Sequence, residues 1–241
     1  MFTADQFVAH RGYQKHFPEN SLLAVQEAIK AGARHVEVDI LLSEDNTFIL
    51  CHDPDLPRIN GGNGLITQMP AAEICQLTAN EPERLAGKFA DVHFSPLTDL
   101  LPIIQANPEV HFYIELKEEA IESHSLALCL QTLYPLLAPV FAQITVISFD
   151  AAAIKAAKTT FSFPRAGVVL VDWPSRNQVI ADTRSDIVFI NKKLIPAGPI
   201  SIDCPLVVYE IAEPALAQDL LNRGASRIET FAIGEMLAAL A

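Results

Sequence analysis

Side chains suited to acid–base and metal chemistry accompany two short apolar runs near the start of the chain. His10 and Arg11 come directly after the run at residues 7–9, and Glu37 and Asp39 stand two positions apart within the run at residues 35–40. Alternate residues of a strand face the same side, so these two carboxylates are predicted to lie side by side. Neighbouring carboxylates repel unless a cation lies between them, and a hard divalent metal is the usual cation. The spacing therefore favours a metal site.

The residues between these two runs predict one helix. Apolar residues recur at helical spacing from Leu22 to Ile29, Asn20 or Ser21 is a suitable N-cap, and Gly32 stands where a helix end favours positive φ. A strand, a helix and a second strand in this order form a parallel βαβ unit. In such a unit both strands end at the same edge of the sheet, which brings their charged residues together.

Strand and helix patterns continue to alternate along the chain. Eight parallel strands are expected, at residues 7–9, 35–40, 110–116, 144–148, 166–171, 187–190, 206–209 and 226–229. Further helix-like segments lie at residues 97–106, 121–136, 151–159, 175–181, 215–223 and 233–240. Eight such units in 241 residues imply an α/β fold, the closed TIM (β/α)8 barrel. Prolines and Gly198 between residues 191 and 204 predict a crossover there without a regular helix.

One segment departs from this alternation. A strand-like run at residues 47–52 follows the second strand after only a few turn residues, which is too short for a parallel crossover. It is therefore expected to return antiparallel and to bring His52 level with Asp39. Residues 53–95 are rich in Pro, Gly and Asn and show one short helical pattern, at residues 71–77. We expect one barrel domain over residues 1–241, with an insertion at residues 41–95 over its mouth.

Functional side chains of such barrels stand at the carboxyl ends of the strands. Seven residues are expected to meet there: His10, Arg11, Glu37, Asp39, His52, Glu115 and Lys117. Glu37, Asp39 and Glu115 would supply oxygen ligands to Mg2+ or Ca2+ and leave positions open for water and a substrate. His10 and His52 suit an acid and base pair. Arg11 and Lys117 suit an anionic substrate.

Each of these residues also has a purely structural interpretation. A histidine at a strand end is often a hydrogen-bonded rim residue, and this applies to His10 and to the histidines at positions 35, 93, 111 and 124. Glu37 and Asp39 could pair with cations of neighbouring strands, and Glu115 could form an ion pair with Lys117. The convergence of all seven residues at one mouth is what favours chemistry.

Composition argues against several classes of protein. The 29 acidic residues exceed the 17 basic ones, and the net charge of -12 opposes binding to nucleic acid or to an anionic lipid surface. The first residues lack the basic and apolar regions of a signal peptide, and no apolar run is long enough to span a bilayer. We therefore expect a cytoplasmic protein without stable membrane association. The four cysteines show no zinc-ligand pattern and are expected to be buried free thiols.

A set of ordered motifs runs through almost the whole chain: His10-Arg11-Gly12, Pro18-Glu19-Asn20-Ser21, Gly32-Ala33, Glu37-Val38-Asp39, His52-Asp53, Leu56, Arg58, Gly64, Pro96-Leu97, Ile114-Glu115-Leu116-Lys117 and Ser148-Phe149-Asp150. This set resembles the glycerophosphodiester phosphodiesterase family. The resemblance implies a TIM barrel with an insertion after strand 2, and hydrolysis of glycerophosphodiesters to glycerol 3-phosphate and an alcohol. It also implies that His10 and His52 are the acid and base, that the three carboxylates hold the metal, and that Arg11 and Lys117 contact the phosphate.

The last two strands depart from this family pattern. The family usually shows Trp-Thr-x-Asn on the seventh strand, where this chain has Tyr209-Glu210-Ile211-Ala212, and it often ends the eighth strand with Thr-Asp, where this chain has Thr230-Phe231. We expect Tyr209, Phe231 and Phe17 to form the wall that contacts the glycerol and the headgroup. Glu210 would add negative charge near an anionic ligand unless it points away.

Two other functions fit the same barrel. A lipid-directed phospholipase of C or D type would be favoured by exposed apolar residues in the insertion and is disfavoured by the acidic composition. A non-catalytic phosphodiester-binding protein is consistent with the altered last strands, but the histidines and carboxylates argue against it. In the enzyme, either water or the substrate's own 2-hydroxyl is the nucleophile.

Overall fold

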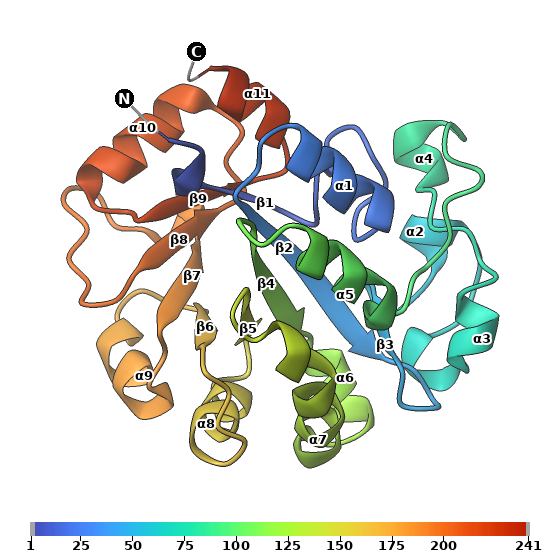
Figure 1. Cartoon of the computed structure of the whole chain (residues 1–241). Coiled ribbons are helices and arrows are strands. Elements are labelled where there is room, and N and C mark those ends of the chain that lie inside the picture. The colour runs from blue at the N-terminus through green and yellow to red at the C-terminus, as the bar shows by residue number, and fades with distance from the viewer. Residues whose placement is uncertain (1–2, 240–241) are drawn as a thin grey trace.

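The computed structural model describes residues 3–239, and its centre is a barrel of parallel strands with helices around it (Figure 1). The barrel strands follow one another in the order β1-β9-β8-β7-β6-β5-β4-β2, and the pairing of β1 with β2 closes the ring. The additional strand β3 pairs antiparallel with β2 outside the ring. The fold is therefore the predicted TIM barrel, with eight strands in the ring and a ninth outside it.

The strand positions confirm the prediction to within a few residues. The barrel strands are β1 (Phe7–Ala9), β2 (His35–Leu42), β4 (His111–Leu116), β5 (Ile144–Ser148), β6 (Ala166–Leu170), β7 (Ile187–Asn191), β8 (Leu206–Tyr209) and β9 (Arg227–Thr230). The helices around the barrel are α1 (Leu22–Lys30), α5 (Leu97–Ala106), α6 (Glu118–Ser123), α7 (Leu126–Leu137), α8 (Ala151–Thr159), α9 (Arg176–Thr183), α10 (Pro214–Arg223) and α11 (Ile233–Ala238). Short 3-10 helices are η1 (Ala4–Gln6), η3 (Ala138–Val140) and η4 (Lys192–Leu194). None of the described helices is long and apolar enough to cross a bilayer.

One predicted helix differs in the structure. The single helix expected at residues 121–136 is wrong, because α6 and α7 are separate helices. Ser125 has extended backbone and starts α7 as an N-cap, with its hydroxyl accepting the N–H of Leu128 at 3.3 Å. Between β7 and β8 the described chain forms only η4, as its prolines and glycine predict.

The insertion begins with the predicted hairpin. In β3 (Phe48–Leu50), Leu50 stands opposite Ile40 of β2, and the N–H of Cys51 donates to the Asp39 carbonyl at 3.1 Å. His52 therefore follows directly beside Asp39. The insertion holds more helix than the one expected at residues 71–77: α2 (Pro57–Asn60), η2 (Ile66–Gln68), α3 (Ala71–Ile74) and α4 (Pro82–Leu85). Each of these helices is too short for a periodic apolar pattern to reveal it.

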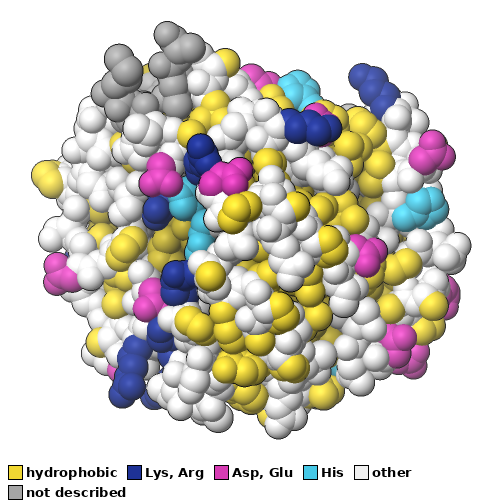
Figure 2. Space-filling model, in the orientation of Figure 1, with side chains coloured by type: hydrophobic (Ala, Val, Ile, Leu, Met, Phe, Trp, Pro, Cys, Tyr) yellow, Lys and Arg dark blue, Asp and Glu magenta, His cyan; other side chains and the backbone are white. Residues whose placement is uncertain are grey.

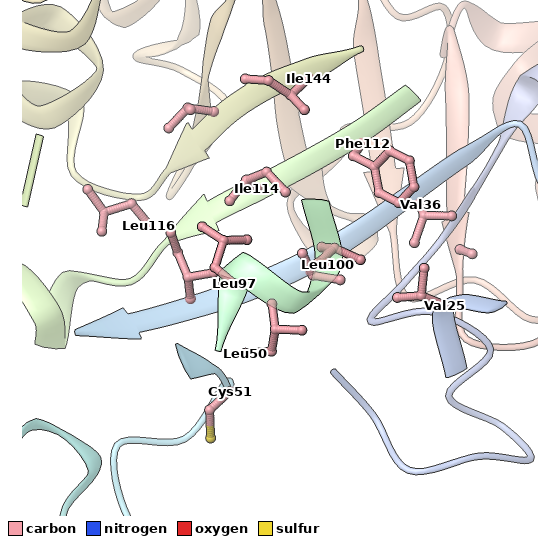
Figure 3. Close-up of a cluster of buried hydrophobic side chains, with 14 of the residues drawn as sticks. Val25, Val36, Leu50, Cys51, Leu97, Leu100, Phe112, Ile114, Leu116 and Ile144 are labelled. Atoms are coloured by element: carbon pink, nitrogen blue, oxygen red, sulfur yellow. The ribbon is translucent and has the colours of Figure 1, made fainter. Parts of the chain in front are cut away.

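Alternation along the strands builds two apolar cores. On the outer face of the barrel, Val36 of β2 and Ile114 of β4 pack with Val25 of α1 and Leu100 of α5 (Figure 3). Inside the barrel, a second apolar layer fills the ring: Val8, Tyr113, Ile147, Val169, Ile187, Phe189 and Val207. The inner layer separates the two ends of the barrel, so polar residues at one end do not mix with those at the other.

The turn after β1 depends on a glycine. Gly12 has φ of +77°, and a Cβ at this position would lie 2.6 Å from the carbonyl carbon of Ala24. The chain therefore passes directly over the first turn of α1, whose N-cap Ser21 accepts the N–H of Ala24 at 3.0 Å. This close passage fixes the position of His10 and Arg11 relative to the helix.

Charged side chains are unevenly distributed on the face drawn in Figure 2. Lys, Arg and His side chains gather there in a strip, with a few Asp and Glu side chains among them, over the region where β7, β8 and β9 lie in Figure 1. Apolar side chains are widespread over the remainder of this face.

Candidate active site

A cavity of about 260 Å³ lies at the carboxyl ends of the barrel strands. All seven residues predicted to meet at the mouth line it, together with Tyr209 and Glu210. The other lining residues are Ile147, Phe149, Val169, Phe189, Asn191 and Glu229. Sites for drug-sized ligands commonly measure about 300 to 1,000 Å³, so this cavity suits a small molecule.

Three carboxylates form the most acidic part of the cavity. Oxygens of Glu37, Asp39 and Glu115 lie within 4.8 Å of one another, because Asp39 stands opposite Glu115 in the parallel register of β2 and β4. Glu37 is 2% exposed; its Oε2 accepts the N–H of Arg11 at 3.0 Å, and its Oε1 has no hydrogen-bond partner within the described residues. A buried carboxylate oxygen without a partner is costly, and a cation would satisfy it. The three donors therefore fit a hard divalent metal.

Two cations lie against the same carboxylates. Arg11 Nε is 3.1 Å from Asp39 Oδ2, and Lys117 Nζ is 3.0 Å from Glu115 Oε1 and 3.7 Å from Asp39 Oδ1. Burial alone would raise the pKa of Asp39, but Arg11, and after it His52 and Lys117, hold that pKa below its usual range. Burial, and then the charge of Asp39, raise the pKa of Glu115 to about 7. The ion pairs of the structural interpretation are thus present, and they neutralise only part of the acidic cluster.

His10 is held at the end of β1. Its backbone N–H donates to the Thr230 carbonyl of the neighbouring chain segment at 3.0 Å, and its ring lines the cavity. Nδ1 of the ring has no hydrogen-bond partner in the described part of the chain. Burial, and then the guanidinium of Arg11, lower the pKa of His10 to about 3. The imidazole is therefore neutral at physiological pH and can accept a proton.

His52 has a different environment. Its Nδ1 lies 2.6 Å from Oδ1 of Asp53, and the other carboxylate oxygen of Asp53 accepts the Nε–H of Arg58 at 2.5 Å. A proton on Nδ1 satisfies this contact and leaves Nε2 of His52 for a ligand. The carboxylate of Asp53 thereby orients the ring of His52.

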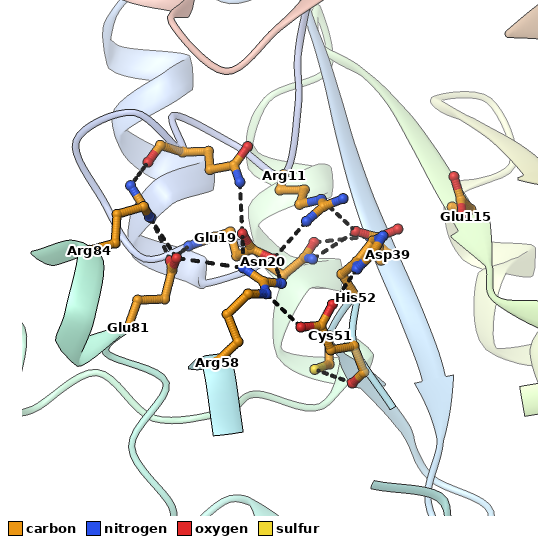
Figure 4. Close-up of polar contacts among 12 residues, drawn as sticks. Arg11, Glu19, Asn20, Asp39, Cys51, His52, Arg58, Glu81, Arg84 and Glu115 are labelled. Atoms are coloured by element: carbon orange, nitrogen blue, oxygen red, sulfur yellow. Dashed lines mark hydrogen bonds and ion pairs between the residues drawn. The ribbon is translucent and has the colours of Figure 1, made fainter. Parts of the chain in front are cut away.

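Glu19 joins the residues around the two histidines into one network (Figure 4). Its carboxylate accepts from Arg58 Nη2 at 2.7 Å and Nη1 at 2.9 Å, and from Arg11 Nη1 at 2.8 Å. Burial would raise the pKa of Glu19, but Arg58 and Arg11 lower it to about 2. The contacts run from Asp53 through Arg58 and Glu19 to Arg11, and they tie the insertion to the end of β1.

Asn20 fixes the orientation of Asp39. Asn20 has φ of +51°, a region that asparagine tolerates better than most residues, and its Nδ2 donates to Asp39 Oδ2 at 2.9 Å. The N–H of Asp39 in turn donates to Asn20 Oδ1 at 2.9 Å.

Sequence reasoning gave no role in the site to Asn20, Glu19, Asp53 or Arg58. Their signal was their place in the motifs that carry the family resemblance.

Aromatic side chains line one side of the cavity. Tyr209 lies there as predicted, with Phe149 and Phe189, and Lys117 Nζ is 5.8 Å from the centroid of the Phe149 ring. Phe231 is not among the residues that line the cavity. Phe17 is likewise outside it, and its ring packs against those of Tyr13 and Phe89. The structure therefore brings Tyr209 to the site and gives Phe231 and Phe17 no place in the cavity wall.

Two more carboxylates line the cavity. Glu210 follows β8 with φ of +64° and lines the cavity. It therefore adds negative charge near the position of an anionic ligand. Glu229 of β9 is 3% exposed, and its Oε1 has no hydrogen-bond partner among the described residues. Burial, and then the charge of Glu115, raise its pKa well above the usual range. Sequence reasoning missed Glu229, although its inward position, beside Val8 of β1, follows from strand alternation.

Fold and site together define a TIM barrel whose mouth combines a metal-fitting carboxylate cluster with two histidines and two cations. The model of the glycerophosphoryl diester phosphodiesterase family matches residues 10–192. The chain belongs to this family, as the ordered motifs predict.

Individual relatives match shorter segments. A glycerophosphodiester phosphodiesterase of Caldanaerobacter subterraneus is 31% identical over 97 residues, which cover 40% of this chain and 39% of the relative. Human glycerophosphodiester phosphodiesterase 1 is 36% identical over 84 residues, which cover 35% of this chain and 25% of the relative. The aligned segments thus span well under half of these curated relatives.

Solved structures share the fold over nearly the whole chain. A phosphodiesterase of Oleispira antarctica, in complex with the product sn-glycerol-3-phosphate, superposes with a TM-score of 0.85 at 23% identity and covers 98% of this chain and 96% of that one. A glycerophosphodiester phosphodiesterase of Parabacteroides distasonis has a TM-score of 0.77 at 18% identity, covering 98% and 96% of the two chains. These likenesses confirm the fold.

Proposed function

We propose that this protein hydrolyses glycerophosphodiesters to glycerol 3-phosphate and an alcohol, with one Mg2+ or Ca2+ ion as cofactor. The observation that carries the proposal is the meeting of two histidines, three clustered carboxylates and two cations in one cavity. Membership of the phosphodiesterase family supports the same reaction.

The proposed metal ligands are Glu37, Asp39 and Glu115. The Oε1 atom of Glu37 supports this choice best. It is buried without a hydrogen-bond partner among the described residues, and a metal ion would satisfy it. A divalent ion held there would polarise the phosphate and offset its negative charge. Burial, and then the charges of Asp39 and Glu229, raise the pKa of Glu37 well above its usual range, so Glu229 acts on this cluster although it is not one of the three.

Arg11 and Lys117 are proposed to contact the phosphate. Arg11 donates through Nη1 to Glu19, while its Nε, which lies 3.1 Å from Asp39 Oδ2, and its Nη2 have no hydrogen bond in the described part of the chain. Lys117 is 7% exposed and lines the cavity. Both cations therefore offer donors to an anionic group, and they attract it into the mouth of an acidic chain.

His10 and His52 are proposed as the base and the acid. The neutral ring of His10 accepts the proton of the attacking hydroxyl, from water or from the substrate's own 2-hydroxyl. His52, oriented by Asp53, donates a proton to the leaving alkoxide. A cyclic phosphate intermediate detected by rapid quenching would identify the 2-hydroxyl as the nucleophile.

Substrate choice is proposed to depend on the aromatic wall around Tyr209 rather than on Phe231, which does not line the cavity. A methylene-sized contact in such a wall changes discrimination by only about 1 to 3 kcal/mol, so a broad headgroup range with graded rates is expected.

The four cysteines are all unpaired, which supports a reducing compartment such as the cytoplasm.

A lipid-directed phospholipase on this barrel has weaker support. Among the described residues of the insertion, Leu65 is the large apolar side chain that is exposed, at 39%, and a single exposed residue does not make a lipid-binding surface. A non-catalytic binding protein would not need two histidines with different hydrogen-bond environments in the cavity where the phosphate is proposed to bind.

An activity panel separates these functions. Glycerophosphocholine, glycerophosphoethanolamine and micellar lysophosphatidylcholine are each assayed with Mg2+, Ca2+ or EDTA, and glycerol 3-phosphate and free alcohol are measured. The proposal expects metal-dependent release of both products, faster from the water-soluble diesters. Faster turnover of the micellar lipid would favour the phospholipase, and binding of glycerophosphocholine without product would favour the binding protein.

A further inference from the structure

A second cavity, of about 240 Å³, lies at the amino-terminal end of the barrel, opposite the candidate active site. The alternation that turns Glu37 and Asp39 into the barrel also turns His35 inward, at the other end of β2. In the same way β4 brings Glu115 to one end and His111 to the other. The inner apolar layer lies between the two cavities.

Two arginines line this cavity without carboxylate partners. Neither Arg165 nor Arg227 forms an ion pair within the described residues, although acidic residues outnumber basic ones in this chain. Arg227 uses only Nε, which donates to the Asp5 carbonyl and to Nε2 of His35, both at 3.1 Å. Its two terminal nitrogens have no hydrogen bond among the described residues. Arg165 donates through Nε and Nη2 to backbone carbonyls, and its Nη1 has no hydrogen bond among the described residues.

A tyrosine hydroxyl at the same cavity has no hydrogen-bond partner within the described residues. Tyr113 is 2% exposed and its ring packs against those of His35 and His111, with centroids 5.9 and 5.1 Å apart, yet its hydroxyl has no hydrogen bond in the described part of the chain. The hydroxyl is therefore available to a ligand. The free groups of Arg227, Arg165 and Tyr113 are N–H and O–H donors, and Nδ1 of His35 is also without a partner among the described residues.

Two carboxylates lie at or beside this cavity, Asp186 in its lining and Asp5 next to His35. Asp186 accepts from Lys158 Nζ and from the Ala166 N–H, both at 2.8 Å, and Asp5 lies 3.0 Å from His35 Nε2. Burial, and then its cationic or histidine neighbours, lower the pKa of His35 to about 4 and that of His111 to about 3. Both rings are therefore neutral, so three cations, Arg165, Arg227 and Lys158, face two carboxylates, Asp5 and Asp186, and the balance around the cavity is positive.

We propose that the cavity at the amino-terminal end of the barrel binds a small phosphate-type anion, held by Arg227, Arg165 and the Tyr113 hydroxyl. Guanidinium groups donate to phosphate oxygens in a fixed fork, and a tyrosine hydroxyl adds a third donor. The volume is below that of sites for drug-sized ligands, so free phosphate or a small phosphomonoester fits the space. The strip of basic and histidine side chains in Figure 2 is the kind of surface that attracts such an anion.

Backbone amide NMR during titration with inorganic phosphate tests this site in the unmodified protein. Phosphate should cause saturable shifts at the amides of His111 and Thr145, which belong to strands that line this cavity, separately from any shifts at His52 in the active site. Sodium chloride at matched ionic strength is the reference. If His111 and Thr145 shift no further with phosphate than with chloride, the proposal is overturned, and this result requires no variant.

A matched pair of variants identifies the donor. Arg227→Gln should weaken phosphate binding at this cavity by about ten- to a hundredfold, the usual effect of losing a hydrogen bond to a charged group. Arg184→Gln removes the same charge from an exposed residue outside the cavity and should leave the titration unchanged. Equal titration curves for Arg227→Gln and the wild type contradict the assignment. Repeating the titration with sn-glycerol 3-phosphate shows whether the bound anion is free phosphate alone or also a monoester.

Discussion

His10 and His52 line the same cavity, but the groups next to the two rings differ. His10 is neutral because burial and Arg11 disfavour its protonated form. His52 lies against the carboxylate of Asp53, which orients its ring. Two groups of one chemical type therefore have different environments, which supports the proposed assignment of His10 as the base and His52 as the acid.

Asp53 is predicted to position His52. Asp53→Asn removes the carboxylate that orients the ring, and turnover of glycerophosphodiesters should fall between about tenfold and 10⁴-fold, as is found when a catalytic histidine loses its orienting carboxylate. Asp55→Asn is the matched control, because Asp55 is exposed two residues further on. Steady-state kinetics of both variants check this prediction. Equal rates for the two variants would show that Asp53 has no part in orienting the histidine.

The histidines at the far end of the barrel predict a dependence of stability on pH. The pKa of His111 is lowered from 6.5 to about 3, so the unfolded chain takes up a proton that the folded chain does not as the pH falls below 6.5. Its contribution to stability is complete above pH 6.5 and is lost as the pH falls through this window, by up to about 3 kcal/mol near pH 4.

Urea denaturation of His111→Gln and the wild type at pH 7 and pH 4.5 measures this contribution. The variant should lose less stability between the two pH values, because glutamine does not titrate. His93→Gln is the control, since His93 is exposed. A loss in His111→Gln as large as that of the wild type would contradict the prediction.

At the scale of elements, β2 delivers most of the site. Its inward positions carry Glu37 and Asp39, and its antiparallel extension β3 returns the chain so that His52 follows beside Asp39. The sequence predicts this because alternation in a strand and the length of a hairpin turn are local properties. It does not predict the helices α2 and α4 of the insertion, since four-residue helices depend on contacts with distant parts of the chain.

The turn between β1 and α1 should be sensitive to a single methyl group. Gly12→Ala places a Cβ 2.6 Å from Ala24 and also strains a backbone with φ of +77°. Gly87 has nearly the same φ, +74°, but a Cβ added there would meet no atom within 4 Å. Gly87→Ala should therefore cost about 1 to 2 kcal/mol from backbone strain alone, and Gly12→Ala clearly more. Chemical denaturation of both variants measures the difference, and equal losses would show that the contact with Ala24 relaxes without cost.

At the scale of the whole molecule, the barrel gathers residues from distant parts of the chain at its two ends. The seven residues of the mouth were predictable because each stands at the end of a recognisable strand. Glu229 was not singled out, because alternation turns it inward but only closure of the ring brings it to the carboxylate cluster. Phe231 was misplaced because the sequence does not show which way a side chain turns after a strand ends.

The central claim is that the mouth of this barrel performs metal-assisted hydrolysis with His10 and His52. The most direct measurement is the release of glycerol 3-phosphate from glycerophosphocholine by the wild type, His10→Ala, His52→Ala and the exposed-site control His93→Ala, each with Mg2+, Ca2+ or EDTA. Turnover should require a metal, fall about 10²- to 10⁴-fold in each of the first two variants, and persist in the control. Wild-type turnover that is unchanged in EDTA, or near wild-type rates in both His10→Ala and His52→Ala, would contradict the claim.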